Sequence, residues 1–240
     1  KHFQHTPLPT NAPVLLGLIG LWNSNFLGAE SYAVVPYDDR LRHLPTYLQQ
    51  LEMESNGKRT TLSNHPLDIA SAPVTWGGLG TNAQHTFFQL LYQGTRIIPV
   101  DFIVSMTHPA AHSEHHATLV ANCFAQAEAL ARGSPSVEAN CTPEIGSTPL
   151  YKDIPGNNPS TTISMDSLTP ETLGSLIALY EHKTYVQSVI WNINAFDQWG
   201  VEAGKTIARD ILEEFRSGHV DGKHDPSTSA LIRRYIENRK

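Results

Sequence analysis

The chain has 240 residues, and 17 lysines and arginines against 23 aspartates and glutamates give it a formal net charge of -6 and a pI near 6.0. This length is enough for one large domain with a buried core. The acidic balance and the lack of a basic run give no electrostatic basis for a nucleic-acid partner. The longest apolar run, Ala12 to Trp22, is far shorter than the ~20 residues that cross a bilayer, so we expect a buried helix and no membrane partner.

The two cysteines, Cys123 and Cys141, are too few to stabilise this chain as a disulfide framework. Cys123 falls in an apolar helical stretch, which favours reduced, inert thiols and a cytoplasmic protein. The polar, proline-containing segment 5–11 interrupts the start of the chain, so no secretory signal is expected. The chain begins at Lys1 and enters a hydrophobic helix almost at once, which indicates that another part of the natural polypeptide precedes it.

Short β-rich runs alternate with amphipathic runs along most of the chain. Strands are predicted at residues 31–37, 72–76, 96–104 and 161–165. Helices are predicted at residues 12–27, 44–54, from 81, 113–132, from 170, 201–215 and from 229, with a stop at Gly28 and caps at Thr81 and Thr169. Residues 186–193 fit either an extension of the helix from 170 or a fifth strand. The alternation predicts an α/β fold: a three-layer αβα sandwich with a mainly parallel sheet over 1–215, then a C-terminal helical tail at 216–240.

Three residues lie where a packed helix does not favour them. Lys205 falls within the apolar stripe of the helix from Val201, near its positive end. Glu54 falls in the last turn of its helix, at the negative end of the dipole. His85 follows a glycine-rich turn just inside a predicted helix N-terminus, where backbone N–H groups can receive an anion. Taken alone, each has a simpler explanation: a lysine whose stem covers apolar surface, a solvated glutamate and an ordinary histidine.

Motifs for metal or nucleotide binding are missing. His112, His115 and His116 are close in sequence, but their spacing matches no zinc signature and is typical of a polar helix start, so no metal is expected. The glycines after Trp76 do not form a dinucleotide-binding motif, and the chain has neither a P-loop nor a Gly-x-Ser-x-Gly elbow.

A series of motifs in fixed order covers nearly the whole chain. It comprises Pro36-Tyr-Asp38, Met53-Glu-Ser-Asn-Gly-Lys58, Gly80-Thr-Asn-x-Gln-His85, Gln93-Gly-Thr95, Ile98-Pro-x-Asp-Phe102, Tyr180-Glu-His-Lys183, Phe196-Asp-Gln-Trp-Gly-Val-Glu-x-Gly-Lys205 and His224-Asp-x-Ser-Thr228. The series resembles the C-terminal portion of the glucose-6-phosphate isomerase family, whose members have two sugar-isomerase α/β domains and helical arms. The block from Phe196 to Lys205 is the most specific part of this resemblance.

The resemblance implies an aldose-ketose isomerase of glycolysis and gluconeogenesis that interconverts glucose 6-phosphate and fructose 6-phosphate without metal or organic cofactor. It implies that Glu54 is the base that moves a proton between substrate C2 and C1 through a cis-enediolate. His85 would assist ring opening from the neighbouring subunit of a homodimer, with Lys205 at the ring oxygen. Gln50 and Gln198 match positions that contact the sugar-phosphate substrate.

The sequence departs from the family's usual residues beside the functional positions, at Leu51, Glu52, Gly78, Leu79 and Asn158. The family's first domain, with its phosphate-binding serine and threonine loop, has no counterpart here. We therefore expect the chain to require its N-terminal domain and to have little activity alone. Two alternatives remain: a non-catalytic sugar-phosphate-binding or interaction module on the same fold, and another ketol-isomerase, which would not need the 196–205 block.

Overall fold

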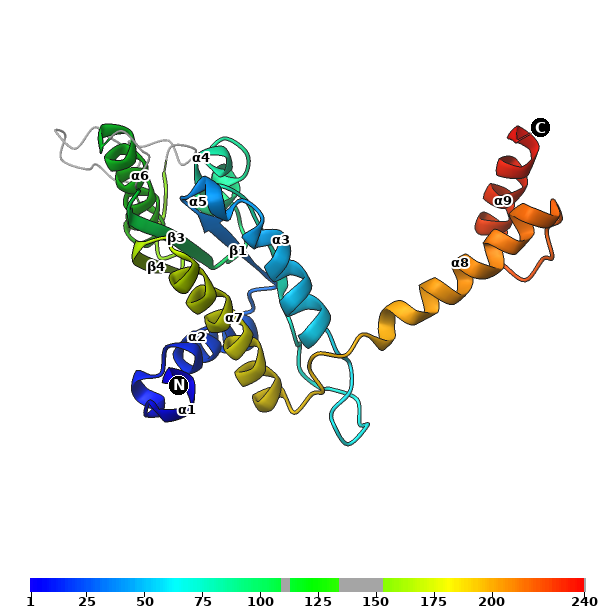
Figure 1. The fold of residues 1–240 in the computed structure, drawn as a ribbon, viewed down its shortest axis with the longest axis horizontal. Helices are drawn as coiled ribbons and strands as arrows, with labels where there is room; N and C mark the ends of the chain where they lie inside the picture. The colour runs from blue at the N-terminus through cyan, green and yellow to red at the C-terminus, as the bar shows by residue number, and fades with distance from the viewer. Residues whose placement is uncertain (109–112, 134–152, 240) are drawn as a thin grey trace. The chain divides into compact units, whose positions relative to one another are not determined.

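The computed structural model describes residues 1–108, 113–133 and 153–239, and the chain forms two compact units, Lys1–Phe196 and Asp197–Lys240. The first unit contains the sheet and the helices that cover it, and the second unit is helical (Figure 1). The domain boundary expected after residue 215 stays a prediction. The two compact units divide earlier, after Phe196, so that the helix Trp199–Ser217 belongs to the second unit.

The first unit is built on a sheet of four parallel strands in the order β2-β1-β3-β4. The strands are β1 (Ser31–Pro36), β2 (Val74–Gly77), β3 (Val100–Thr107) and β4 (Ser160–Ser167). The parallel α/β sheet predicted from the sequence is confirmed. Strand β3 begins later than residue 96 because Pro99 has no N–H to donate to the ladder, although its carbonyl accepts the N–H of Ala33 at 2.9 Å.

Helices connect the strands and follow them. Their bounds are α1 (His2–His5), α2 (Ala12–Leu21), α3 (Leu44–Leu48), α4 (Gly80–Ala83), α5 (Phe88–Gln93), α6 (Ser113–Arg132) and α7 (Pro170–Trp191) in the first unit, with α8 (Trp199–Ser217) and α9 (Pro226–Asn238) in the second. Short 3-10 turns lie at η1 (Leu8–Thr10) and η3 (Asp39–Leu41), and π-helical turns continue α2 and α3 as η2 (Trp22–Phe26) and η4 (Gln49–Glu54).

The helix starts expected from capping residues have different outcomes. At α7, Thr169 accepts the N–H of Thr172 while the Thr172 hydroxyl accepts the N–H of Thr169, so this cap is confirmed. The helix runs on to Trp191, which decides the ambiguity at residues 186–193 in favour of a helix. The cap expected at Thr81 is wrong, because α4 starts one residue earlier at Gly80 and receives no side-chain cap.

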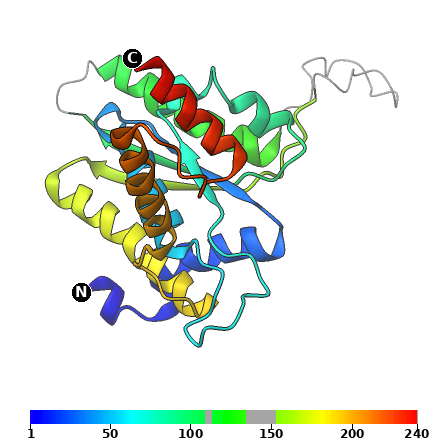
Figure 2. The same ribbon diagram turned by 90° about the vertical axis from the view of Figure 1, so that its right-hand side faces the viewer.

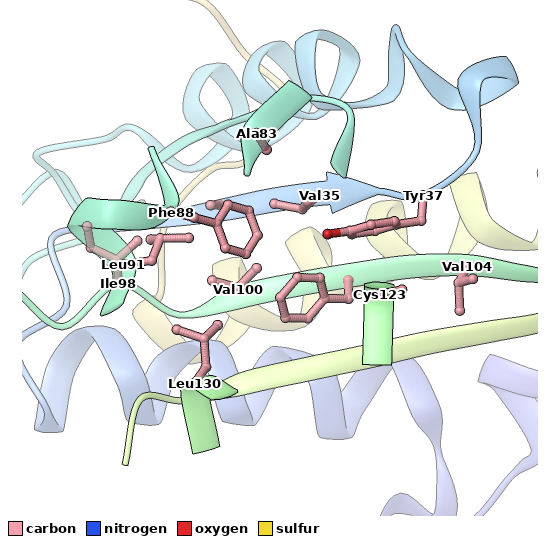
Figure 3. Packing of buried hydrophobic residues seen from close by; sticks show 12 residues of the cluster. Val35, Tyr37, Ala83, Phe88, Leu91, Ile98, Val100, Val104, Cys123 and Leu130 are labelled. Atoms are coloured by element: carbon pink, nitrogen blue, oxygen red, sulfur yellow. The ribbon is translucent and has the colours of Figure 1, made fainter. Parts of the chain in front are cut away.

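Successive residues of the central strands point to opposite faces of the sheet, and their side chains pack into two hydrophobic cores, one on each face. On one face, Val35 and Phe102 pack with residues of α5 and α6, including Phe88 and Cys123 (Figure 3). Figure 2 shows α6 (green) on this side of the sheet and α2 (blue) with α7 (yellow) on the other. This arrangement confirms the three layers. Burial raises the pKa of the Cys123 thiol to about 12, as an inert thiol requires, whereas Cys141 lies outside the described residues.

The apolar helix α2 is less buried than the sequence predicted. It packs against α7 and the sheet through one side only, so Leu15, Leu18 and Ile19 remain 40 to 46% exposed on the other. The glycine stop is confirmed, since Gly28 follows η2 with a φ of 72°, which a side chain would disfavour. Within the described ranges, no helix has the length and apolar character needed to cross a membrane.

Candidate active site

Glu54 lies at the end of the helix that follows β1. The regular α-helix expected from Leu44 to Glu54 ends at Leu48, and residues 49–54 form the wider π-helical turn η4. The buried side of this helix includes Leu44, Leu48, Glu52, Ser55 and Asn56. These positions keep the helical spacing of three and four residues, so Glu52 comes to the buried side of the helix, within a type of turn that often marks a functional site.

The Glu54 side chain is half-buried, and within the described part of the chain its carboxylate accepts no hydrogen bond. Gln50 lies one turn earlier on the same side of the helix and is exposed. The Lys58 ammonium donates to the backbone carbonyls of Glu54 and Ser55 at 2.6 and 2.9 Å. This ammonium therefore offsets the negative end of the helix dipole. Because the Glu54 carboxylate accepts no hydrogen bond within the described residues, it is available for an external partner.

A buried polar network lies next to Glu54. The Lys183 ammonium, on α7, donates to both carboxylate oxygens of Glu52 at 2.8 and 2.9 Å and to the Tyr32 hydroxyl at 2.9 Å. The Tyr32 hydroxyl also donates to Glu52, and the ammonium lies 4.2 Å from the centre of the Tyr32 ring. The side chains of Lys183 and Glu52 are each only 4% exposed. Burial, reinforced by Glu52, raises the pKa of Tyr32 well above its usual value.

The network continues along α7 toward the centre of the sheet. The Tyr180 hydroxyl donates to the Asp101 carboxylate of β3 at 3.0 Å. Burial raises the pKa of Asp101 to about 6, although the charge of Lys183 acts in the opposite direction. One buried lysine therefore lies near two buried carboxyl groups, of which only Glu52 is its direct partner.

The pairing of Glu52 with Lys183 was not predicted from the sequence. A signal for it was present, because the apolar stripe of α7 continues past Tyr180 through Lys183, Thr184 and Gln187, all of which are buried. Polar residues at helical spacing on a core face indicate a buried network.

His85 lies in the turn between α4 and α5 and is exposed. The expected position just inside a helix N-terminus is wrong, because α4 ends at Ala83 after a single turn. Its neighbour Gln84 donates to the Tyr37 hydroxyl at 2.9 Å, which ties this turn to the end of β1. Gly80 permits the close approach, since a Cβ there would lie 2.2 Å from the Tyr37 ring.

Glu54 and His85 lie at opposite ends of the sheet. The helix of residues 44–56 begins beyond the carboxyl end of β1 and extends for ~20 Å at ~1.5 Å per residue, toward the edge where the parallel strand β2 starts. His85 comes after β2 has ended, at the carboxyl edge. In Figure 1 this cyan helix runs away from α4, in agreement with these positions.

Gln198 and Lys205 belong to the second unit. Gln198 is the exposed residue that precedes α8, and Lys205 lies two turns further on. The Lys205 side chain is 57% exposed and pairs with Glu202 at 2.7 Å. The apolar stripe predicted for this helix is present but exposed within its own unit, as Val201 and Leu212 illustrate.

The histidines that resembled a metal cluster make other contacts. The His116 ring nitrogen Nε2 lies 3.0 Å from the carbonyl of Met106, and His112 lies outside the described residues. Among residues 1–108, 113–133 and 153–239, no three His, Cys, Asp or Glu side chains gather as metal ligands.

The layered parallel sheet and the available carboxylate on a helix end define a three-layer α/β protein with a candidate general base. The family model described as phosphoglucose isomerase matches residues 1–232. The chain therefore belongs to the phosphoglucose isomerase family.

Curated relatives carry the same name. The chain is 53% identical over 239 residues to glucose-6-phosphate isomerase of Burkholderia orbicola strain MC0-3, covering 98% of this chain and 44% of that protein. It is 49% identical over 250 residues to glucose-6-phosphate isomerase of Chlorobium luteolum, covering 100% of this chain and 45% of that protein. The chain thus spans less than half the length of these relatives.

Solved structures agree with this assignment. The crystal structure of a glucose-6-phosphate isomerase from Chlamydia trachomatis superposes with a TM-score of 0.81 at 35% identity, covering 99% of this chain and 44% of that chain. A hypothetical protein from Thermus thermophilus has a TM-score of 0.65 at 22% identity over 88% of this chain and 47% of its own, and supports the fold alone.

Proposed function

We propose that this chain is the C-terminal part of a glucose-6-phosphate isomerase and that the intact polypeptide interconverts glucose 6-phosphate and fructose 6-phosphate. The observation that carries the proposal is the Glu54 carboxylate, which is half-buried, has no hydrogen-bond partner within the described residues and has Gln50 one turn away. Family membership and the names of the curated relatives support the substrate class in this proposal.

In the proposed reaction, the Glu54 carboxylate removes the proton from C2 of the open-chain aldose. The electron pair of the C2–H bond forms the C1–C2 double bond of a cis-enediolate, and the carbonyl oxygen at C1 takes the negative charge. A proton passes from the C2 hydroxyl to the C1 oxygen, and Glu54 returns its proton to C1, which gives the ketose. Gln50 holds the sugar beside the base.

His85 and Lys205 act on ring opening in this proposal, and Gln198 contacts the substrate. The positions of Glu54 and His85 at opposite ends of the sheet support a site in which His85 comes from a second copy of the chain. Phosphate binding is assigned to the part of the relatives that this chain does not cover. We therefore expect little turnover from these 240 residues alone, because the sugar lacks the remote binding energy that orients it.

The direct test is Glu54→Gln in the intact polypeptide, with Glu181→Gln as a matched control on an exposed carboxylate. Loss of the base should lower kcat by roughly 10²- to 10⁴-fold, with a small change in KM. The control should keep wild-type kcat. Unchanged kcat in Glu54→Gln would show that Glu54 is not the base, as expected if this chain is a non-catalytic sugar-phosphate-binding module and the catalytic groups lie elsewhere in the polypeptide.

Mixing subunits tests the origin of His85. In a two-fold dimer that pairs Glu54 of one chain with His85 of the other, mixed dimers of Glu54→Gln and His85→Ala subunits contain one intact site. An equal mixture should recover roughly a quarter of wild-type activity after subunit exchange. If both residues served the same site from one chain, no activity would return.

A further inference from the structure

We propose that Lys183 and Glu52 are positioning residues whose buried ion pair fixes the π-helical turn η4 and thereby the direction of the Glu54 carboxylate. This inference rests on the proposed function, because it assigns these residues a part in the proton transfer by Glu54. Neither residue has a place among the expected catalytic or substrate-binding groups.

The first argument is that α7 holds the turn on both sides of Glu54. Two residues before Glu54, Glu52 bonds to Lys183 at 2.8 and 2.9 Å. Two residues after it, the Asn56 amide donates to the carbonyl of Thr184 at 3.0 Å. Both anchors are consecutive residues of one helix, so α7 holds the backbone that carries the base at two adjacent points.

The second argument is that Lys183 cannot itself reach a substrate. An ammonium has three donors, and those of Lys183 are directed to the two oxygens of Glu52 and to the Tyr32 hydroxyl. The side chain is 4% exposed. Any effect of Lys183 on the reaction must therefore pass through Glu52 and the turn to which it belongs.

The third argument is energetic. Burying a lysine and a glutamate costs solvation that their attraction rarely exceeds, and well-packed apolar residues often replace such pairs without loss of stability. Unlike apolar residues, the ion pair fixes the orientation of the turn, because its three hydrogen bonds are directional. A proton-transferring carboxylate needs this, because an error of ~1 Å can lower the rate by ~100-fold.

The experiment separates positioning from stability in the intact polypeptide. Lys183→Met leaves Glu52 buried and uncompensated, and should lower both the melting temperature and kcat. The triple variant Tyr32→Phe/Glu52→Leu/Lys183→Met removes the hydroxyl, the carboxylate and the ammonium that form the three hydrogen bonds of this ion pair at once. Its melting temperature should return toward the wild-type value, while kcat stays about 10- to 100-fold low and KM changes little.

Tyr180→Phe is the matched control, because its hydroxyl ties the same helix to Asp101 of β3 rather than to η4. It should lose stability and keep kcat. Glu52→Gln is the second variant in case the triple variant does not fold. It keeps the shape but sets an amide nitrogen against the ammonium in place of an oxygen at 2.9 Å, so kcat should fall by about 3- to 10-fold. The melting temperature should fall as well, because the buried ammonium loses its counter-charge.

The outcomes distinguish this inference from the proposed function. Wild-type kcat in the folded triple variant, or in Glu52→Gln when the triple variant does not fold, overturns the positioning role and leaves the proposed function intact. Wild-type kcat in Glu54→Gln overturns the proposed mechanism and this inference with it. A low kcat in the folded triple variant, together with full activity in Tyr180→Phe, supports both.

Discussion

Asp101→Asn should remove a pH-dependent loss of stability that the buried Asp101 carboxyl imposes. Burial raises the pKa of this carboxyl from 3.8 to about 6. Below pH 3.8 the carboxyl is protonated in the folded and unfolded chains alike, so it causes no loss of stability there. Between these two values only the unfolded chain ionises, so stability falls by about 1.4 kcal/mol per pH unit and by ~3 kcal/mol in all once the pH exceeds 6.

The asparagine keeps the shape and the oxygen that accepts the Tyr180 hydroxyl, but it does not ionise. The stability of the variant relative to wild type should therefore rise by ~3 kcal/mol between about pH 4 and pH 7. Urea unfolding of both proteins, followed by tryptophan fluorescence at several pH values, measures this difference, since Trp191 at the end of α7 is buried. A difference that does not change with pH would refute the reasoning.

Two further changes test the packing that places the candidate residues. Gly80→Ala sets a methyl group 2.2 Å from the Tyr37 ring and should lower the free energy of unfolding in urea by about 1 to 3 kcal/mol. Gly174→Ala is the control, because nothing lies within 4 Å of a Cβ there, and it should be neutral or stabilising. Equal effects of the two substitutions would contradict the contact with Tyr37. Thr169→Ala removes the oxygen that accepts the N–H of Thr172 at 3.2 Å and should lower stability by ~1 kcal/mol in the same measurement. An unchanged urea midpoint would show that the cap is not needed.

Local patterns predicted most of the fold, because they depend on neighbouring residues. The alternation of apolar runs located all four strands, and the helix of residues 113–132 was found with its bounds unchanged. Errors arose where a contact distant in sequence decides the local structure. The α-helix predicted from Leu44 to Glu54 is replaced by a π-helical turn from Gln49, and the buried Glu52 of this turn finds its partner Lys183 131 residues away.

The candidate site shows the same limit. Glu54 was identified correctly as a helix-end glutamate, but the sequence does not show that α7 holds the turn around it. His85 was expected inside a helix because Thr81 and Gln84 match a capping box. The structure instead starts α4 at Gly80, where close packing against Tyr37 determines the turn. Capping motifs compete with such packing, and a single sequence does not show which one prevails.

The placement of the proposed catalytic groups follows from how a parallel sheet is connected. After each parallel strand the chain must return to the amino end of the sheet before the next strand begins. The helix that follows β1 therefore ends near the amino end of the sheet, whereas the turn that follows β2 stays at the carboxyl end. Glu54 belongs to the first kind of position and His85 to the second. On the proposed function, a sugar that needs both groups has to lie between two chains, and a two-fold axis then makes two equal sites from one arrangement. The rigidity of η4 matters more in such a site, because the partner histidine belongs to another chain and cannot correct an error in the position of the base.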